Sequence, residues 1–508
     1  MKWCADGGPT GPPSARRSGI GMTDADKGSS APGTNADTNP GKRTRAARAG
    51  RGWGRAVVIG GGYAGLLAAR VLADHFDEVL VLERDVVDRT TGAHPSAPQS
   101  YHAHAMLARG AQALEVLFPG LRAELEQLGA PVYDYGERIS FLLPTGYAVR
   151  ATTGVRIQSF TRDELERRIR GRVLDLARVR LLDGARVRGL GRGADGRINS
   201  VRYRTEQGGE QEATADLVVD ASGRTTSIDD WLTEAGLPVS AKNTVKAKIT
   251  YTTMVFDRTP EEKDYDVAYQ MSFAPAVRRG GAMLAVEHGR WVCSLFGFEQ
   301  QPPTDPDGFL DYARSLDNPR LAEQIARRSG HDELHRYTNP GSTWRLHHRN
   351  PGWPEGLIAI GDALCVFNPV YGQGLTVPAI QAEALGSLLR RRSTGTGPTG
   401  LSREYLRAAA EIIKVPWSLS TTSDLMWSPS GQPPAARFAH WYNKQVFALA
   451  RHDADVWTRF VKVANMTGPS SLLTHPTVLA KIARQAVTRR PNPGADDAPY
   501  ADRRDGAA

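Results

Sequence analysis

The sequence predicts an α/β fold in which a mostly parallel sheet is interleaved with a second, mixed β-sheet and followed by a helical region. Three observations support this fold class. A glycine-rich turn near residue 60 separates a short apolar run from a helical pattern, further apolar runs end in acids near residues 220 and 362, and alternating segments fill much of 241–339. Short apolar runs between turns are typical of buried parallel strands, whereas alternation at period two is typical of half-buried strands.

Composition places most of the chain among globular proteins. It has 508 residues, of which 40% are hydrophobic and 23% charged, enough for two or three domains. Its three cysteines, Cys4, Cys293 and Cys365, are too scattered for a disulfide framework or a metal site, so we predict no metal. The sequence contains no run of 18 apolar residues, so we predict no membrane span and expect a cytoplasmic protein.

The net charge of +9 is concentrated at the N-terminus. Residues 1–54 carry nine basic and four acidic residues among many glycines, prolines and serines, which predicts a disordered basic tail. Arg16 and Arg17 resemble an export signal, but no apolar segment follows them, and Met22 is an alternative start. Because the charge lies in this tail, we expect no nucleic-acid partner.

The first ordered unit reads as strand, glycine turn, helix, strand and acid. Gly60 permits a tight turn, Gly62 allows a pyrophosphate to approach the backbone, and Gly65 allows helix and strand to pack closely. Glu83, followed by Arg84, lies where a carboxylate accepts ribose hydroxyls. The segments are a strand at 55–59, a turn at 60–65, a helix at 66–72 and a strand at 78–82.

This context predicts a Rossmann-type, dinucleotide-binding unit, because the helix N-terminus also offers free N–H groups and a positive dipole end to phosphates. The alternative, a glycine turn in an ordinary α/β domain, requires Glu83 to be a coincidence. A second match, Gly191–Gly196, lies between two segments that alternate at period two, so we predict a β-hairpin tip without dinucleotide binding.

Two later segments favour FAD over NAD. The apolar runs before Asp220 and Asp362 predict strands of the same parallel sheet, with their acids at its ligand-binding edge. Asp362 is suited to ribityl hydroxyls. The turn Gly372-Gln373-Gly374 opens a helix predicted over about residues 375–389, and its backbone donors suit a reduced, anionic flavin ring.

Together these motifs resemble the group A flavoprotein monooxygenases, the p-hydroxybenzoate hydroxylase-like family, over about residues 55–395. The glycine motif, the Asp220 segment and the Gly361-Asp362 segment occur in that family's order. The second segment departs from the family's Asp-Gly, since it reads Asp-Ala-Ser-Gly as in related prenyl reductases and halogenases. Residues 159–166 resemble the helix start whose arginine, here Arg162, reaches FAD.

A finer resemblance is to actinobacterial epoxidases of polyene and terpenoid substrates. Residues 98–110 carry it, together with a C-terminal region containing Pro416, Trp417, Asp424 and Pro429. Within 98–110, His102 and His104 are candidate catalytic residues or structural hydrogen-bonding groups. Arg109 is a candidate for a phosphate or flavin contact, the alternative being a surface ion pair.

The resemblance implies that NADPH or NADH, or a separate flavin reductase, reduces FAD and that a flavin C4a-hydroperoxide transfers one oxygen atom to a small lipophilic substrate. We favour epoxidation of a terpenoid or polyketide alkene, because we find no persuasive base motif. The alternatives are an aromatic hydroxylase, an alkene reductase resembling geranylgeranyl reductases, and a flavin protein without turnover. Flavin-dependent halogenases of this fold need a lysine in the first part of the FAD domain. A halogenase is therefore disfavoured, because no lysine lies between Lys42 and Lys242.

These expectations divide the chain into an FAD domain at 55–240 and 340–395, a substrate-binding β-sheet domain at 241–339, a helical region at 401–490 and a disordered tail at 491–508. Residues 244–256 and 268–298 have strand-like patterns. The amphipathic stretch at 470–487 is expected to cover the substrate cavity, with membrane-surface association as the alternative.

Overall fold

The computed structural model describes residues 53–87, 101–205, 208–259, 264–328, 333–392, 398–427 and 432–488, all within one compact unit. The predicted tails at 1–54 and 491–508 lie outside these residues, apart from Trp53 and Gly54. Trp53 packs edge-on against Phe76, with ring centroids 5.7 Å apart.

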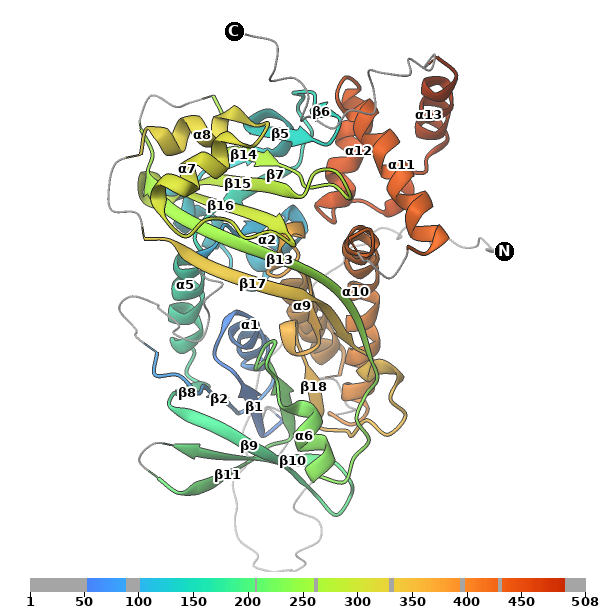
Figure 1. Ribbon diagram of the computed structural model, residues 1–508. Coiled ribbons are helices and arrows are strands. Elements are labelled where there is room, and N and C mark those ends of the chain that lie inside the picture. Colours follow the sequence, from blue (N-terminus) through green and yellow to red (C-terminus); the bar gives the residue numbers. More distant parts are fainter. Residues whose placement is uncertain are drawn as a thin grey trace, which may run out of the picture. The chain divides into compact units, whose positions relative to one another are not determined.

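A five-stranded, all-parallel sheet forms the predicted dinucleotide-binding unit (Figure 1). Its central strand pairs with β12 on one side and β2 on the other, and Ile59 lies opposite both Leu82 and Asp220. Asp220 in turn lies opposite Ala359. The carboxyl ends of four strands therefore meet at one edge. In spatial order the strands are β18 (Leu357–Ala359), β12 (Leu217–Asp220), β1 (Arg55–Ile59), β2 (Glu78–Leu82) and β8 (Val179–Leu182).

Helices pack around this sheet because their apolar faces and the apolar side chains of the strands bury one another. Ala68, Leu72 and Leu385 are 0% exposed at the contact between α1 and α9. Helix α9 is the helix predicted after the Gly372–Gly374 turn. The helices of this layer are α1 (Tyr63–Leu72), α2 (Ala108–Leu117), α3 (Leu121–Gln127), α5 (Arg162–Leu174), α6 (Ile228–Glu234) and α9 (Thr376–Arg392).

Two small antiparallel sheets flank the parallel one. Strands β9 (Ala185–Arg192) and β10 (Ile198–Thr205) form a hairpin whose tip includes Gly196 at φ +81°, which confirms the predicted hairpin at 191–196. Strand β11 (Glu210–Thr214) completes that sheet. The other consists of β3 (Ala105–Met106), β7 (Arg156–Ser159) and β4 (Val132–Asp134), which leads into α4 (Tyr135–Arg138).

An eight-stranded mixed sheet forms the second layer and contains the strands predicted over 244–298. Its longest strand, β13, alternates between two faces: Met254 and Phe256 pack under α7 (Pro306–Arg314) and α8 (Pro319–Ala326), whereas Tyr251 and Val255 point the other way. In order the strands are β19 (Cys365–Val366), β17 (His335–Arg345), β13 (Lys242–Asp257), β16 (Arg290–Phe298), β15 (Arg279–Val286), β14 (Val267–Gln270), β5 (Ile139–Leu143) and β6 (Gly146–Tyr147).

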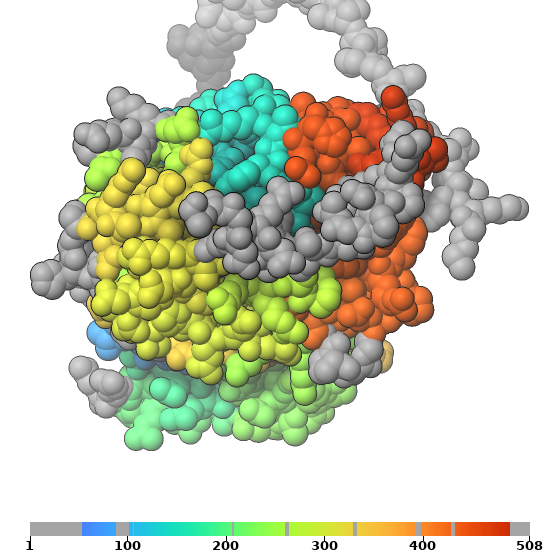
Figure 2. All heavy atoms as spheres, turned by 45° about the horizontal axis from the view of Figure 1, so that its top comes forward, coloured from blue at the N-terminus to red at the C-terminus, as the bar shows by residue number. Residues whose placement is uncertain are grey.

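The C-terminal region is helical, as predicted. Helix α10 packs on α9, β18 and β13, and the later helices lie beside β5 and β6 (Figures 1 and 2). The backbone N–H of Val149 donates to the carbonyl of Ala450 across this contact. Among the described residues, the helices are too short or too polar to cross a membrane. The region comprises α10 (Leu401–Leu425), α11 (Pro434–Ala450), α12 (Ala454–Ala464) and α13 (Pro476–Thr488).

Candidate functional site

The glycine turn after β1 is packed so tightly that two of its glycines cannot be replaced without movement. Gly60 has φ +102°, and a Cβ there would lie 2.6 Å from the carbonyl oxygen of Ala221. A Cβ on Gly65 would lie 1.9 Å from the carbonyl oxygen of Gly60. Both glycines therefore bring α1 against β1 and β12, as the motif predicts.

Gly62 differs, since a Cβ at this position would meet no atom of the described residues within 4 Å. Gly62 is the N-cap of α1 and has no side chain that could accept a capping hydrogen bond from the helix. The first turn of the helix contains no acidic residue. The first N–H groups of the helix are thus open to an anionic ligand. This open backbone at a helix N-terminus fits a bound pyrophosphate.

Glu83 and Arg84 follow β2 at the same edge. The Glu83 carboxylate is 3% exposed and accepts hydrogen bonds from the backbone N–H groups of Gly61, at 2.6 Å, and Asp85, at 2.9 Å. These bonds hold the carboxylate beside the glycine turn. Arg84 is largely exposed, and its Nε lies 3.8 Å from the Asp85 carboxylate.

Asp220 ends β12 and is completely buried. Its carboxylate accepts from the backbone N–H and the hydroxyl of Ser222, at 3.0 and 2.5 Å, and from the Thr226 hydroxyl at 2.6 Å. Burial raises its pKa, whereas Ser222 and Thr226 lower it, and the net pKa is raised. The predicted cofactor-binding acid Asp220 is therefore engaged in shaping its own turn.

Asp362, after β18, faces three guanidinium groups. Burial raises its pKa, and Arg224, Arg162 and Arg345 oppose that shift without cancelling it. The preceding Gly361 has φ +64°, and its N–H donates to Gln381 Oε1 at 2.9 Å. This hydrogen bond joins the Asp362 turn to α9, and the predicted contact of the Asp362 carboxylate with the ribityl chain stays a prediction.

The Gly372–Gly374 turn leads into α9 at the same edge. Gly372 has φ +67° after the 3₁₀ turn η5 (Pro369–Tyr371), and a Cβ on Gly374 would meet no atom within 4 Å. The first turn of α9 has no acidic residue. Two helix N-termini, each with open space at a glycine, therefore offer backbone N–H groups that suit an anionic cofactor.

Arg162 and Arg109 occupy different environments. Arg162 follows the N-cap Thr161 of α5, and its Nε donates to Glu166 at 2.6 Å. Burial lowers its pKa, but Glu166, Asp362 and Asp163 together raise it by more. Arg109 forms an ion pair with Glu383 of α9, at 2.5 Å, so its predicted contact with the cofactor stays a prediction.

His102 lies against β13 of the eight-stranded sheet, and His104 follows it two residues later. His102 Nδ1 lies 2.6 Å from the Thr253 hydroxyl, and His104 Nδ1 lies 2.6 Å from the His102 carbonyl oxygen. Burial, with a smaller effect of His335, lowers the His102 pKa to about 4. Burial and then Arg162 lower the His104 pKa to about 3. Both rings are neutral at physiological pH and are weak bases.

A hydrogen-bond chain orients the His102 ring. The N–H of Ala103 donates to the Ser294 hydroxyl at 2.9 Å, and the Ser294 and Thr253 hydroxyls lie 2.5 Å apart. If each hydroxyl donates onward once, Nδ1 of His102 accepts and Nε2 carries the hydrogen. Nε2 is buried and has no hydrogen-bond partner among the described residues. With this tautomer, Nε2 of His102 is an N–H donor without a partner among the described residues.

Aromatic side chains cover the sheet surface beside His102. The His102 ring lies 6.0 Å from Tyr251 and 5.6 Å from Tyr337, and Tyr251 lies 5.5 Å from Phe296. These rings pack with Val370, from the segment leading to Gly372. We call the following set the aromatic face: Phe141, Tyr251, Tyr269, Phe296 and Tyr337.

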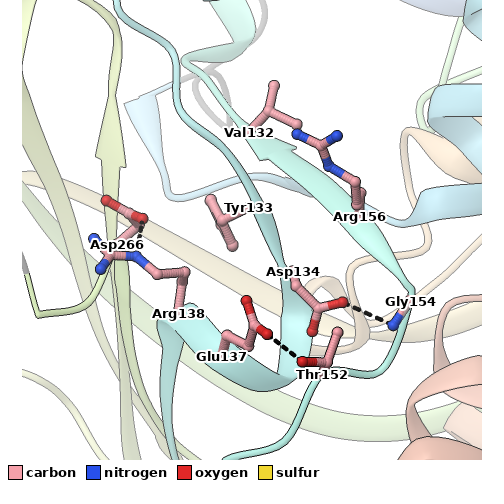
Figure 3. Close-up of a pocket in the computed structure, with 9 residues that line it drawn as sticks. All are labelled: Val132, Tyr133, Asp134, Glu137, Arg138, Thr152, Gly154, Arg156 and Asp266. Carbon is pink, nitrogen blue, oxygen red and sulfur yellow. Dashed lines mark hydrogen bonds and ion pairs between the residues drawn. The ribbon is translucent and has the colours of Figure 1, made fainter.

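A separate hollow of about 490 Å³ lies between β4, α4 and Asp266 (Figure 3). Its polar groups already bond to one another. Arg138 pairs with Asp266 at 2.8 Å, and Asp134 accepts from Gly154 N–H at 2.8 Å. These bonds satisfy Arg138, Asp266 and Asp134 within the hollow, and none of the predicted site residues lines it.

The chain matches the family model described as an FAD binding domain over residues 55–416. It belongs to this family. Protein Rv3254 of Mycobacterium tuberculosis (strain ATCC 25618 / H37Rv) is 31% identical over 397 residues, 75% of this chain and 82% of that protein. Kynurenine 3-monooxygenase of Salinispora arenicola (strain CNS-205) is 27% identical over 342 residues, 63% and 69% of the two chains.

Solved structures share the fold at lower identity. The flavin-dependent brominase Bmp2 has a TM-score of 0.59 at 13% identity, with 85% of this chain and 99% of that chain covered. Flavin-dependent monooxygenases also have the fold. The protein is therefore an FAD-binding enzyme of the monooxygenase family, which confirms the predicted cofactor and fold class. Its particular reaction is a separate question, because a brominase shares the architecture.

Sequence reasoning missed several residues of the site. Arg224 and Arg345 were not expected to face Asp362, and Tyr251 and Tyr337 were not expected beside His102. Arg224 has a local signal, since it directly follows the Asp220–Gly223 turn. The two tyrosines have none, because strand pairing alone brings β13 and β17 to residues 101–104.

Proposed function

We propose that the protein inserts one oxygen atom from O₂ into an alkene of a lipophilic terpenoid or polyketide, and that NADPH or NADH supplies the electrons. In the net reaction the alkene gains one oxygen atom. The second oxygen atom leaves as water, with two electrons from the nicotinamide and two protons. FAD supplies the oxygen-activating chemistry when bound.

The observation that carries this proposal is the aromatic face next to a neutral histidine. Tyr251 and Phe296 are 6% and 1% exposed and pack as apolar rings beside His102, and we propose that a hydrocarbon chain packs against them. Burial raises the pKa of Tyr251 and of Tyr337, so neither phenol is ionised near pH 7. An alkene needs no base, because its π electrons attack the electrophilic oxygen directly.

Within this proposal the chain's residues orient the substrate and exclude water. The aromatic face binds the hydrocarbon portion, and the His102 N–H is available to a hydroxyl or carbonyl oxygen of the substrate. Glu83, Asp362, Gly62 and Gly374 hold the cofactor. Excluding water from the space between the sheets favours transfer of oxygen to the substrate over unproductive loss.

Aromatic hydroxylation is a second candidate, favoured by the kynurenine 3-monooxygenase relative. A phenol substrate is helped by a base that removes its proton. The low pKa of His102 makes that residue a poor base. We therefore rank alkene oxygenation first, and a flavin-dependent alkene reductase remains the alternative of opposite redox sense.

Isotope incorporation distinguishes these reactions. We would supply the FAD-loaded protein with NADPH, ¹⁸O₂ and either geranylgeraniol or kynurenine, then analyse products by mass spectrometry. Alkene oxygenation predicts one ¹⁸O in a geranylgeraniol product without loss of hydrogen. One ¹⁸O in kynurenine alone would favour the hydroxylase, and a product two hydrogens heavier without ¹⁸O would favour the reductase.

A further inference from the structure

A buried carboxyl group joins the C-terminal helix α10 to the segment in front of α9. Asp424 is 0% exposed, and its Oδ1 accepts from the amide of Asn368 at 3.0 Å and the hydroxyl of Tyr371 at 2.9 Å. Its Oδ2 accepts from the hydroxyl of Ser342 on β17 at 3.3 Å. One side chain of α10 therefore contacts two separate parts of the chain.

The two residues bonded to Oδ1 enclose the turn η5. Asn368 caps the turn, because its own Oδ1 accepts from the N–H of Val370 at 3.3 Å. Tyr371 is the last residue of the turn, and Gly372 follows it directly at φ +67°. Asp424 thus fixes both ends of η5, and the path of the chain into Gly372–Gly374 depends on this contact.

We propose that Asp424 is a positioning residue for the flavin, because it holds η5 against α10 and so places Gly372–Gly374 at the N-terminus of α9. This inference rests on the proposed placement of the flavin ring beside Gly372–Gly374. Asp424 acts through Asn368 and Tyr371 and touches no reacting atom. The helical C-terminal region thereby contributes to the cofactor site that the rest of the chain builds.

The charge state of Asp424 gives this role a pH dependence. Burial raises its pKa to about 7, although the hydrogen bonds from Tyr371, Asn368 and Ser342 oppose the shift. The titratable groups that face it are Tyr371 of η5 and Tyr251 of β13, and the pKa of each is itself raised by burial. Among the described residues, no lysine or arginine pairs with Asp424.

The sign follows from linkage. A carboxyl whose pKa is higher when packed than when hydrated binds its proton more tightly in the packed state. Protonation therefore favours contact between α10 and η5, and ionisation favours their separation. We expect FAD to be held more weakly as the pH rises through 7.

The test measures the dissociation constant and release rate of FAD from pH 6 to 9 by flavin fluorescence, using the full chain. For the wild type we expect the dissociation constant to rise about 3- to 10-fold between pH 6.5 and 8.5, a change of about 0.6–1.4 kcal/mol. Asp424→Asn is permanently neutral and should keep the low-pH value throughout. Ser420→Ala is the matched control, because the partners of the buried Ser420 hydroxyl among the described residues all lie within α10.

Tyr371→Phe provides a second test that does not depend on folding of the Asp424 variant. It removes a donor that stabilises the carboxylate, so the midpoint should move to higher pH. A pH-independent wild type, or an Asp424→Asn profile that still follows the wild type, overturns the inference. If FAD binds with the expected profile but no ¹⁸O reaches any substrate, the proposed oxygenation fails and the role of Asp424 stands.

Discussion

The carboxyl edge of the five-stranded sheet and the aromatic face of the eight-stranded sheet carry their functional groups differently. At the edge, the main features come from backbone conformation: Gly60 and Gly65 allow close packing, and Gly62 leaves a helix N-terminus open. On the face, side chains from separate strands assemble around His102. In the proposed function, backbone features position the cofactor, whereas side chains from separate strands select the substrate.

The sharpest way to break this comparison is at the glycine turn. Gly65→Ala places a Cβ 1.9 Å from the carbonyl oxygen of Gly60, so we expect a loss of about 2–4 kcal/mol in unfolding free energy and no retained FAD. Gly62→Ala meets no atom within 4 Å, so its thermal midpoint without FAD should match the wild type while FAD affinity falls. Calorimetry and flavin content check both variants. Equal stability of the two would contradict the close-packing role of Gly65.

The second test separates two acids of the same edge. Asp362→Asn should weaken FAD binding about 10- to 100-fold, roughly 1.4–2.7 kcal/mol, because a charge-assisted hydrogen bond becomes neutral. Asp220→Ala should instead lower the unfolding free energy by about 1–3 kcal/mol, because it leaves Ser222 and Thr226 without their buried acceptor. Titration with FAD and chemical denaturation distinguish the two. A fully flavinylated Asp362→Asn protein would show that this acid is misassigned.

The third test moves to the aromatic face. His102→Gln should lower turnover about 10-fold and leave FAD affinity within about 2-fold of the wild type, because in the proposed function His102 donates to the substrate and not to FAD. The His102 pKa of about 4 lies below that of the unfolded chain, so this residue's contribution to stability is present above about pH 6.5 and lost as the pH falls toward 4. Acid unfolding of the variant should therefore begin at lower pH. If the variant binds FAD more weakly and its turnover with bound FAD is unchanged, His102 belongs to the cofactor site.

The smallest effect is expected at the hairpin that imitates the dinucleotide motif. Gly196→Ala introduces a side chain at φ +81° and should cost about 1 kcal/mol of stability. FAD affinity should not change, since this turn joins two antiparallel strands. Equilibrium unfolding and FAD titration provide the check. A change in FAD affinity would mean that the hairpin contributes to cofactor binding.

The same comparison explains how much could be predicted. The parallel sheet, the turn at Gly60–Gly65 and the helix after Gly374 were predictable, because each depends on neighbouring residues. The contact of His102 with Thr253 was not, because it requires residues 151 positions apart to meet through strand pairing. The contact of Asp424 with Tyr371 is equally hard to predict, because it joins residues 53 positions apart, although Asp424 lies in the segment that resembles the epoxidases.

The order of the parallel strands also has a consequence for biosynthesis. The central strand β1 is made first, yet its neighbour β12 pairs with β18, which begins only at Leu357. At about 5–20 residues per second, roughly 15–60 s separate the synthesis of these strands. During that interval the nascent chain contains an incomplete hydrophobic sheet that must not aggregate. FAD can bind only after β18, the last strand of the sheet, has been translated.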